Sequence, residues 1–401
     1  MLRRTLTSVM GILLISPAML AQQPQKGLDT TTFVVMGEGL AAGVCDFSLS
    51  DVGQRSSFPA LMARQMGALF PQPKIQPPGI GNVMGFSRLP VRLPAALQTT
   101  VRRPFPRFPQ LIVHDKVPLW TQLEYAQQMR PTFALVELGF SEVLDAAVHG
   151  DLSRLPDIDS FRSSYEQIVA TLRSTYADVL VTTVPDPLDT AYFNSPIWAA
   201  QLTRVPTYVV LGLYGLTVDD WITVPGLVEI GNQFLERRSA PLPSGSFIDA
   251  TTADQIRAYV EQMNQEIRSV ASSHGALLFD LHGLTRNFKD DGVTISGRRL
   301  SADFLGGLYS LDGYYPGATG QSLIANAILE TLNAALGTSF SPISVEESLA
   351  TDSVADYRIS SGPEIPIQAL AECIPELKMR SILHLKSQME APLRRSSPGR
   401  R

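Results

Sequence analysis

The sequence predicts an α/β protein, a three-layer α/β/α sandwich with a central parallel sheet. Four short runs of apolar and β-branched residues end at glycine, proline or aspartate, as buried parallel strands do. The runs cover residues 31–36, 133–138, 179–184 and 276–279. Helical patterns alternate with these runs, and such alternation produces a parallel sheet that is covered on both faces.

Four amphipathic helices are predicted along the chain. The first begins near Pro59, because proline is favoured at the first helical position, and ends at Gly67. The second follows Asp159 or Ser160, either of which is a suitable N-cap. The second, third and fourth helices each have an apolar stripe on one face. These stripes are Phe161, Tyr165, Ile168 and Leu172; Ile256, Val260, Met263, Ile267 and Val270; and Ile324, Ile328 and Leu332.

Ligands of parallel α/β sheets bind beyond the carboxyl ends of the strands. The loops that begin at Gly37, Gly139 and Asp312 are therefore the candidate site region.

Composition indicates a globular protein without a nucleic-acid partner. The chain has 401 residues, 44% of them hydrophobic and 18% charged, which is typical of a folded soluble domain. Its 33 basic and 38 acidic residues give a net charge of −5, so no global basic field attracts nucleic acid.

The N-terminus reads as a secretory signal peptide over residues 1–21. Arg3 and Arg4 precede an apolar run over residues 9–20, and the expected cleavage follows Ala21. Met19 departs from the small residue usual at that position, so an uncleaved anchor is the alternative. We expect an exported, periplasmic or extracellular protein with no stable membrane span after signal removal.

The predicted domain covers residues 32–337. Within it, residues 194–246 are rich in proline, glycine and aromatic residues without a clear period, and are expected to form an irregular insertion, a lid or a pocket wall. Residues 341–401 are expected to be a poorly structured extension that ends in a basic tail.

No metal site or cofactor is predicted. The two cysteines, Cys45 and Cys373, exclude a disulfide framework and a thiolate cluster, while a single bridge and two free thiols both remain open. The five histidines show no ligand-like spacing: His114, His149, His274, His282 and His384. A hard cation held by Glu38, Glu142 and Asp312 is the less favoured alternative.

Three spaced segments resemble the motif blocks of the SGNH/GDSL hydrolases, particularly their exported bacterial branch. Residues 33–40 (FVVMGEGL) stand in the place of the Gly-Asp-Ser-Leu block, and residues 54–61 (QRSSFPAL) are similar to that branch. Residues 136–142 (VELGFSE) resemble the Gly-x-Asn-Asp block, and residues 306–316 (GGLYSLDGYYP) the Asp-x-x-His-Pro block. The resemblance implies a flavodoxin-like sheet and hydrolysis of esters.

The resemblance also implies which positions carry the chemistry. A serine attacks the ester carbonyl, a histidine accepts its proton, and an aspartate orients the histidine. Gly39 stands at the nucleophile position and Tyr315 at the histidine position, so only Asp312 matches the triad. Removing either a serine or a histidine from such a triad lowers turnover by about 10⁶.

The oxyanion side of the predicted pocket is altered as well. Ser141 replaces the expected asparagine and is followed by Glu142, while Gly139 and Glu38 complete the predicted pocket. The block that supplies the second donor loop is unassigned between residues 79–82 and 93–95.

Each matched residue also has a purely structural interpretation. Gly37 and Gly39 suit a tight turn, Asp312 suits a loop cap, and Tyr315 suits a packed ring.

Two functions remain open at this stage. The chain is a homologue that has lost catalysis and retains a cleft for a small ester, acyl, glycan or lipid-like ligand. Alternatively, it is an active carboxylic-ester hydrolase that uses a substitute constellation involving Asp312, Ser141, Ser48 or Ser50.

Overall fold

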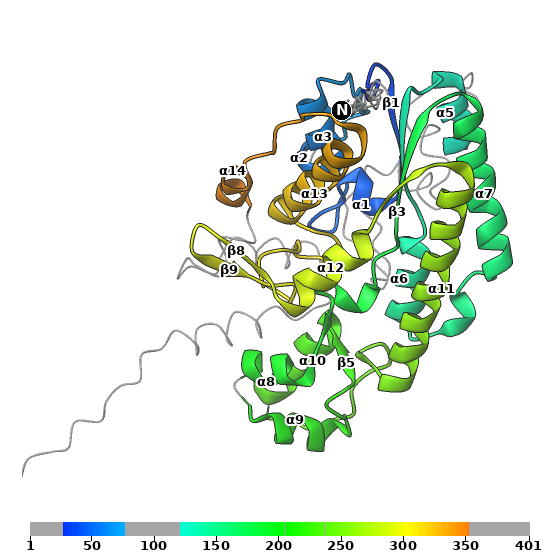
Figure 1. Ribbon diagram of the computed structural model, residues 1–401. Helices are drawn as coiled ribbons and strands as arrows, with labels where there is room; N and C mark the ends of the chain where they lie inside the picture. Colours follow the sequence, from blue (N-terminus) through cyan, green and yellow to red (C-terminus); the bar gives the residue numbers. More distant parts are fainter. Residues whose placement is uncertain (1–26, 77–120, 204, 236, 353–401) are drawn as a thin grey trace, which may run out of the picture.

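The core of the protein is a four-stranded parallel sheet. In the computed structural model, which describes residues 27–76, 121–203, 205–235 and 237–352, the strand order is β1-β2-β3-β7 (Figure 1). The strands are β1 (Phe33–Gly37), β2 (Phe133–Glu137), β3 (Asp178–Thr182) and β7 (Leu277–Phe279). Each predicted run matches one strand to within two residues, and all neighbouring pairs run parallel. The carboxyl ends of the strands therefore meet at one edge.

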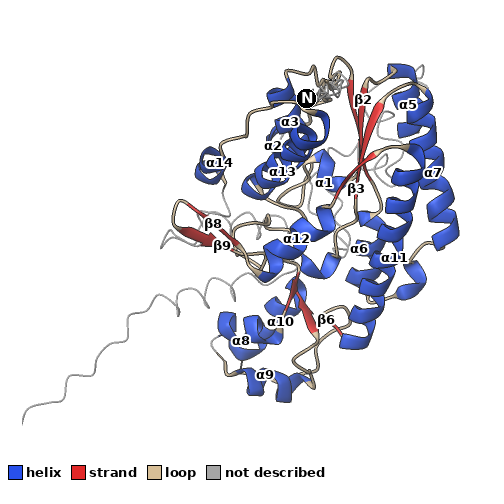
Figure 2. Ribbon diagram, viewed as in Figure 1, coloured by secondary structure: helices blue, strands red, loops and turns tan. Residues whose placement is uncertain are grey.

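Helices cover both faces of this sheet, which confirms the predicted three-layer sandwich (Figure 2). On one face lie α1 (Gly39–Ala42), α2 (Asp51–Ser56), α3 (Phe58–Met66) and α13 (Ala318–Leu336). On the other lie α5 (Gln122–Met129), α6 (Phe140–His149), α7 (Ile158–Ser174) and α11 (Ala250–His274). The stripes predicted for α7, α11 and α13 face the core, with Val260, Ile267 and Ile328 fully buried.

Shorter elements connect these layers. They are η2 (Leu152–Arg154), η3 (Pro187–Asp189), α12 (Leu281–Asp290), and the hairpin of β8 (Val293–Ile295) and β9 (Arg298–Leu300). Both η3 and α12 follow core strands at the carboxyl edge of the sheet, which places their side chains beside the candidate site region.

The insertion is more regular than expected. It contains α8 (Pro196–Thr203), α9 (Thr207–Tyr214) and α10 (Val224–Leu235). Strands β4 (Phe193–Asn194), β5 (Trp221–Thr223) and β6 (Phe247–Ile248) add a small antiparallel sheet in the order β4-β5-β6. These elements form the lobe at the bottom of Figure 1. The expectation of an irregular segment was wrong because α9 has apolar residues around its whole circumference, so its sequence shows no helical period.

The chain continues beyond the predicted domain into a further helix. Ser344 caps α14 (Val345–Thr351), which packs against α13. Four sequence predictions fall outside the described residues: the predicted signal peptide at residues 1–21, the unassigned block at 79–82 or 93–95, Cys373 and the basic tail. Within the described part of the chain, Cys45 is a free thiol. None of the helices described there combines the length and apolar character needed to cross a bilayer.

Candidate active site

The three motif segments meet at the carboxyl edge of the sheet. Gly39 opens α1 directly after β1, and Gly139 opens α6 directly after β2. The loop from Asp312 to Tyr315 precedes α13, and its Tyr315 side chain meets Gly39 and the Phe140 ring of α6. Segments that are more than 250 residues apart along the chain therefore form one site.

Tyr315 fills the space that a side chain at position 39 would occupy. A Cβ atom built on Gly39 would lie 2.5 Å from Cζ of Tyr315, and closer still to its hydroxyl oxygen. Real Cβ atoms essentially never approach other heavy atoms to less than 3.0 Å. The predicted nucleophile position is thus without a side chain, and the residue at the predicted histidine position occupies the vacant volume.

The surroundings of Tyr315 keep its phenol protonated. The residue is 7% exposed, and its ring packs edge-on against Phe140 with the ring centroids 6.1 Å apart. Burial, followed by the negative charges of Glu38 and Asp312, raises the pKa of Tyr315 well above its usual range, while a hydrogen bond with the Ser141 side chain opposes the shift. A group with so high a pKa is a poor general base at neutral pH.

Asp312 organises its own loop. It is fully buried, and its Oδ1 accepts hydrogen bonds from the backbone N–H groups of Tyr314 (2.8 Å) and Tyr315 (2.9 Å). Its Oδ2 lies 3.4 Å from the backbone nitrogen of Phe47, which donates to it. Burial raises the pKa of Asp312 to about 7 in spite of these bonds. The carboxylate expected to orient a histidine side chain instead binds backbone amides, in agreement with a loop cap.

Glu38 joins the first two motif segments. Its Oε1 accepts from the backbone N–H of Gly139 (3.0 Å), and its Oε2 accepts from that of Ser141 (2.7 Å). Two amides of the predicted oxyanion loop therefore already hold a carboxylate. A developing oxyanion at the same amides would have to displace it, and would meet its negative charge.

Glu142 is the most exposed titratable group of the site. Its carboxyl group lies against protein and forms a hydrogen bond with Glu38. Partial loss of hydration and the neighbouring charge of Glu38 raise the pKa of Glu142 to about 7.

Glu137 belongs to the same site and was not identified from the sequence. It is 1% exposed, and its Oε2 accepts hydrogen bonds from the backbone N–H groups of Glu38 and Ala41, both at 3.2 Å. Burial, followed by the charge of Glu38, raises the pKa of Glu137 well above its usual range. The signal for it in the sequence was a single charged residue inside an otherwise apolar strand.

Of the candidate substitute nucleophiles, Ser141 bonds with Tyr315 through its hydroxyl. The backbone amide of Ser48 donates to the carbonyl oxygen of Cys45. Ser50 is buried at the start of α2. The described histidines also bond elsewhere: His149 with Asp145, His274 with Glu166 and His282 with the carbonyl oxygen of Val184.

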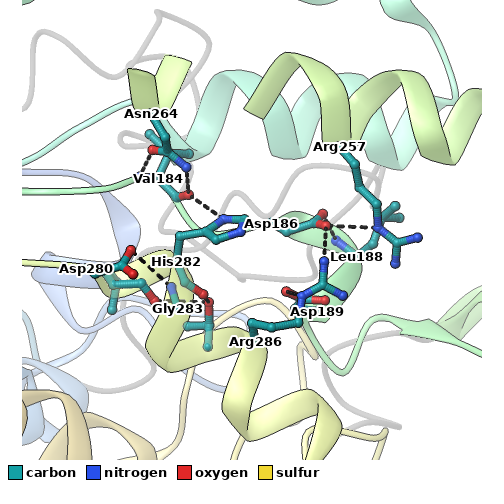
Figure 3. Close-up of polar contacts among 12 residues, drawn as sticks. Val184, Asp186, Leu188, Asp189, Arg257, Asn264, Asp280, His282, Gly283 and Arg286 are labelled. Atoms are coloured by element: carbon teal, nitrogen blue, oxygen red, sulfur yellow. Dashed lines mark hydrogen bonds and ion pairs between the residues drawn. The ribbon is translucent and has the colours of Figure 1, made fainter. Parts of the chain in front are cut away.

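A second polar network lies beyond the carboxyl ends of β3 and β7 (Figure 3). Asp186 is 1% exposed, and its Oδ2 lies 3.1 Å from Nε of Arg257 and 3.7 Å from a terminal nitrogen of Arg286. Nε of Arg286 lies 3.3 Å from the fully buried Asp189. Burial, followed by the charge of Asp186, raises the pKa of Asp189 to about 7.

This network also holds the insertion in place. The Trp221 ring, on β5, has the guanidinium carbon of Arg257 at 5.0 Å and Nζ of Lys289 at 5.5 Å from its centroid. Lys289 also donates to the carbonyl oxygen of Phe193 at 3.1 Å. Cation–π contacts of this kind stabilise a desolvated interface, so we interpret the network as structural.

Glu38, Glu142 and Asp312 are the residues of the less favoured cation site. Among the residues that the structure describes, no three histidine, cysteine or acidic side chains are placed to hold a metal ion together.

Comparison with known proteins gives weak structural similarities. No family model matches the chain, and no curated protein matches its sequence. Among solved structures, it is similar to LAE5, an alpha/beta hydrolase from the metagenome of Lake Arreo in Spain, with 14% identity, a TM-score of 0.37, and coverage of 76% of this chain and 95% of that one. The psychrotrophic esterase EstA from Pseudoalteromonas sp. is 12% identical, with a TM-score of 0.34 and coverage of 77% of this chain and 100% of that one. An extracellular lipase from Streptomyces rimosus is 16% identical, with a TM-score of 0.33 and coverage of 76% of this chain and 99% of that one. Similarities this low carry no argument about this chain's activity.

The class of protein follows from the chain itself. It has a three-layer α/β/α fold, with its candidate site at the carboxyl edge of a parallel sheet. The segments that meet there are those that resemble the SGNH/GDSL blocks, with Gly39 and Tyr315 at the serine and histidine positions.

Proposed function

We propose that this protein is an exported homologue of the SGNH/GDSL ester hydrolases that has lost serine catalysis and binds a small ester, acyl, glycan or lipid-like ligand. The observation that carries the proposal is the packing of the Tyr315 hydroxyl into the space beside Gly39. Glycine and tyrosine stand where the resemblance expects the serine and the histidine, and with Tyr315 present there is no room for a serine side chain at position 39.

The altered surroundings of the site support the same conclusion. Asp312 is committed to the amides of its own loop, and Glu38 occupies the amides of Gly139 and Ser141. An ester hydrolase that used Ser141 in place of the lost serine would need a base. The hydroxyl of Ser141 is instead paired with the protonated phenol of Tyr315.

The test is a reactivity assay on the purified full chain. Acyl nitrophenyl esters and a fluorophosphonate probe would be applied to the unmodified protein, to Gly39→Ser with Tyr315→His, and to Gly39→Ala with Tyr315→His. The last two differ by one oxygen atom, so probe labelling of the first of them alone assigns reactivity to position 39. Turnover or labelling of the unmodified protein would refute the loss of catalysis.

Two further measurements address binding and export. Saturation-transfer NMR with a short fatty acid and with an acetylated oligosaccharide would detect ligand binding by the unmodified protein. N-terminal sequencing of protein recovered from outside the cytoplasm would test cleavage after Ala21, and protein that retains residues 1–21 would contradict the proposed signal peptide.

A further inference from the structure

Two arginine side chains outside the motif segments have most of their hydrogen-bonding capacity unused. Arg257 lies on α11 and Arg286 on α12, and their side chains are 28% and 36% exposed. Each guanidinium group carries several N–H donors and no acceptor. Within the described part of the chain, the pair forms a single hydrogen bond, from Nε of Arg257 to Oδ2 of Asp186 at 3.1 Å. The remaining donors can therefore bind a ligand.

One buried carboxylate holds the two arginines side by side. A terminal nitrogen of Arg286 lies 3.7 Å from the same Oδ2 atom of Asp186 that accepts from Arg257. The Trp221 ring packs against the guanidinium group of Arg257, with its centroid 5.0 Å from the guanidinium carbon. In Figure 3 the terminal nitrogens of Arg257 lie on the side of its guanidinium group away from Asp186. Both groups are oriented in advance, which lowers the entropy cost of binding an anion.

The positive charge of the pair exceeds the negative charge that faces it. Asp186 is one carboxylate shared by two guanidinium groups. The carboxyl group of Asp189 lies 3.3 Å from Nε of Arg286, but burial and the charge of Asp186 raise the pKa of Asp189 to about 7, so below that pH it is mostly uncharged. Asp254 lies 4.0 Å from Arg257, and because it is 79% exposed its charge is screened by solvent. A net positive charge therefore remains for a ligand.

We propose that Arg257 and Arg286 bind an oxyanion, the carboxylate or phosphate group of a small ligand. Guanidinium groups hold both kinds of group through paired N–H···O bonds. The pair lies beyond the carboxyl ends of β3 and β7, and parallel α/β sheets bind their ligands at this edge. This role is additional to the contacts by which the network holds the insertion. It stands independently of the proposed function, because neither arginine belongs to the Gly39 and Tyr315 site.

The experiment is calorimetric titration of the purified full chain with inorganic phosphate and, separately, with butyrate, at about pH 6, where Asp189 is mostly uncharged. The test variant is Arg286→Gln, because it leaves the hydrogen bond between Arg257 and Asp186 in place. A second test variant, Arg257→Lys, keeps a positive charge beside that buried carboxylate. The matched control is Arg55→Gln, which removes the same charge from α2, on the other face of the sheet from α11. Circular dichroism verifies the fold of each variant.

We expect the unmodified protein and the control to bind at least one of the two anions saturably. Arg286→Gln should bind it about tenfold or more weakly, because charge-assisted hydrogen bonds are lost. Arg257→Lys should also bind more weakly, because an ammonium group lacks the planar fork of a guanidinium. Binding of butyrate alone would assign the site to a carboxylate, and binding of phosphate alone would assign it to a phosphoryl group.

Three results would overturn the proposal. They are the absence of binding by the unmodified protein, equal affinities of the unmodified protein and Arg286→Gln, and an equal loss of affinity in Arg55→Gln. The last result would show a general effect of net charge in place of a defined site.

Discussion

The contact between Gly39 and Tyr315 can be tested by stability measurements alone. Gly39→Ala adds one methyl group at a helical position where alanine has the better propensity, so without crowding it would stabilise the protein by up to about 1 kcal/mol. In the structure the new Cβ lies 2.5 Å from Cζ of Tyr315, whereas ordinary contact begins at 3.4 Å. The ring must retreat by nearly an ångström against Phe140. Overpacking of this kind costs about 1–3 kcal/mol.

A double-mutant cycle isolates this contact from other effects of the substitution. Leucine at position 315 lacks the atoms that meet the new methyl group, so Gly39→Ala should be neutral or stabilising in a Tyr315→Leu background. The difference between the two backgrounds, about 1–3 kcal/mol, is the coupling energy. Urea unfolding followed by circular dichroism measures it. Gly212→Ala, at an exposed helical glycine with nothing within 4 Å of its Cβ, is the control and should not destabilise.

One result would refute the reasoning. If Gly39→Ala has the same effect in both backgrounds, Tyr315 does not occupy the nucleophile position.

Two further predictions concern buried carboxyl groups. Asp312→Ala should lower the free energy of unfolding in urea by about 2–5 kcal/mol, because it leaves the buried amides of Tyr314 and Tyr315 unpaired, whereas Asp312→Asn retains an acceptor and should cost less. The raised pKa of Asp189, about 7 against 3.8 for an ordinary aspartate, means that the folded state holds the proton more tightly than the unfolded state. The contribution of Asp189 to stability is therefore complete below about pH 4 and is lost as pH rises to about 7, by up to about 4 kcal/mol. Asp189→Asn should flatten this part of a pH series of urea unfolding curves, and an unchanged slope would contradict the assignment.

The strands were predictable because burial on both faces demands continuous apolar runs. A run such as residues 133–138 has few alternatives in a globular chain, and its boundaries agreed with β2 to one residue. Gly39 and Gly139 were predictable at the same edge for a related reason, because consecutive parallel strands place their following loops together. Asp312 was placed there by the motif resemblance, since its loop follows the separate β8-β9 hairpin.

The missed features depend on contacts between distant parts of the chain. Glu137 looked like an interior residue of a strand because its partners, the amides of Glu38 and Ala41, are 99 and 96 residues away. The pairing of Asp186 with Arg257 spans 71 residues, and neither residue has a local pattern that indicates the other. Helix α9 of the insertion was missed for the opposite reason, since a helix without a polar face produces no period.

The interlocked fit of Gly39 and Tyr315 constrains the order in which these two residues arose. In a chain descended from an active hydrolase, a tyrosine that enters before the serine is lost collides with the serine side chain, whereas loss of the serine first opens the space that the tyrosine fills. Once both changes are present, restoring serine alone recreates the collision, and restoring histidine alone leaves a hole beside a glycine. Under the proposed function, each single reversal would cost stability without restoring the serine–histidine pair, so the two substitutions together would make the proposed loss difficult to reverse.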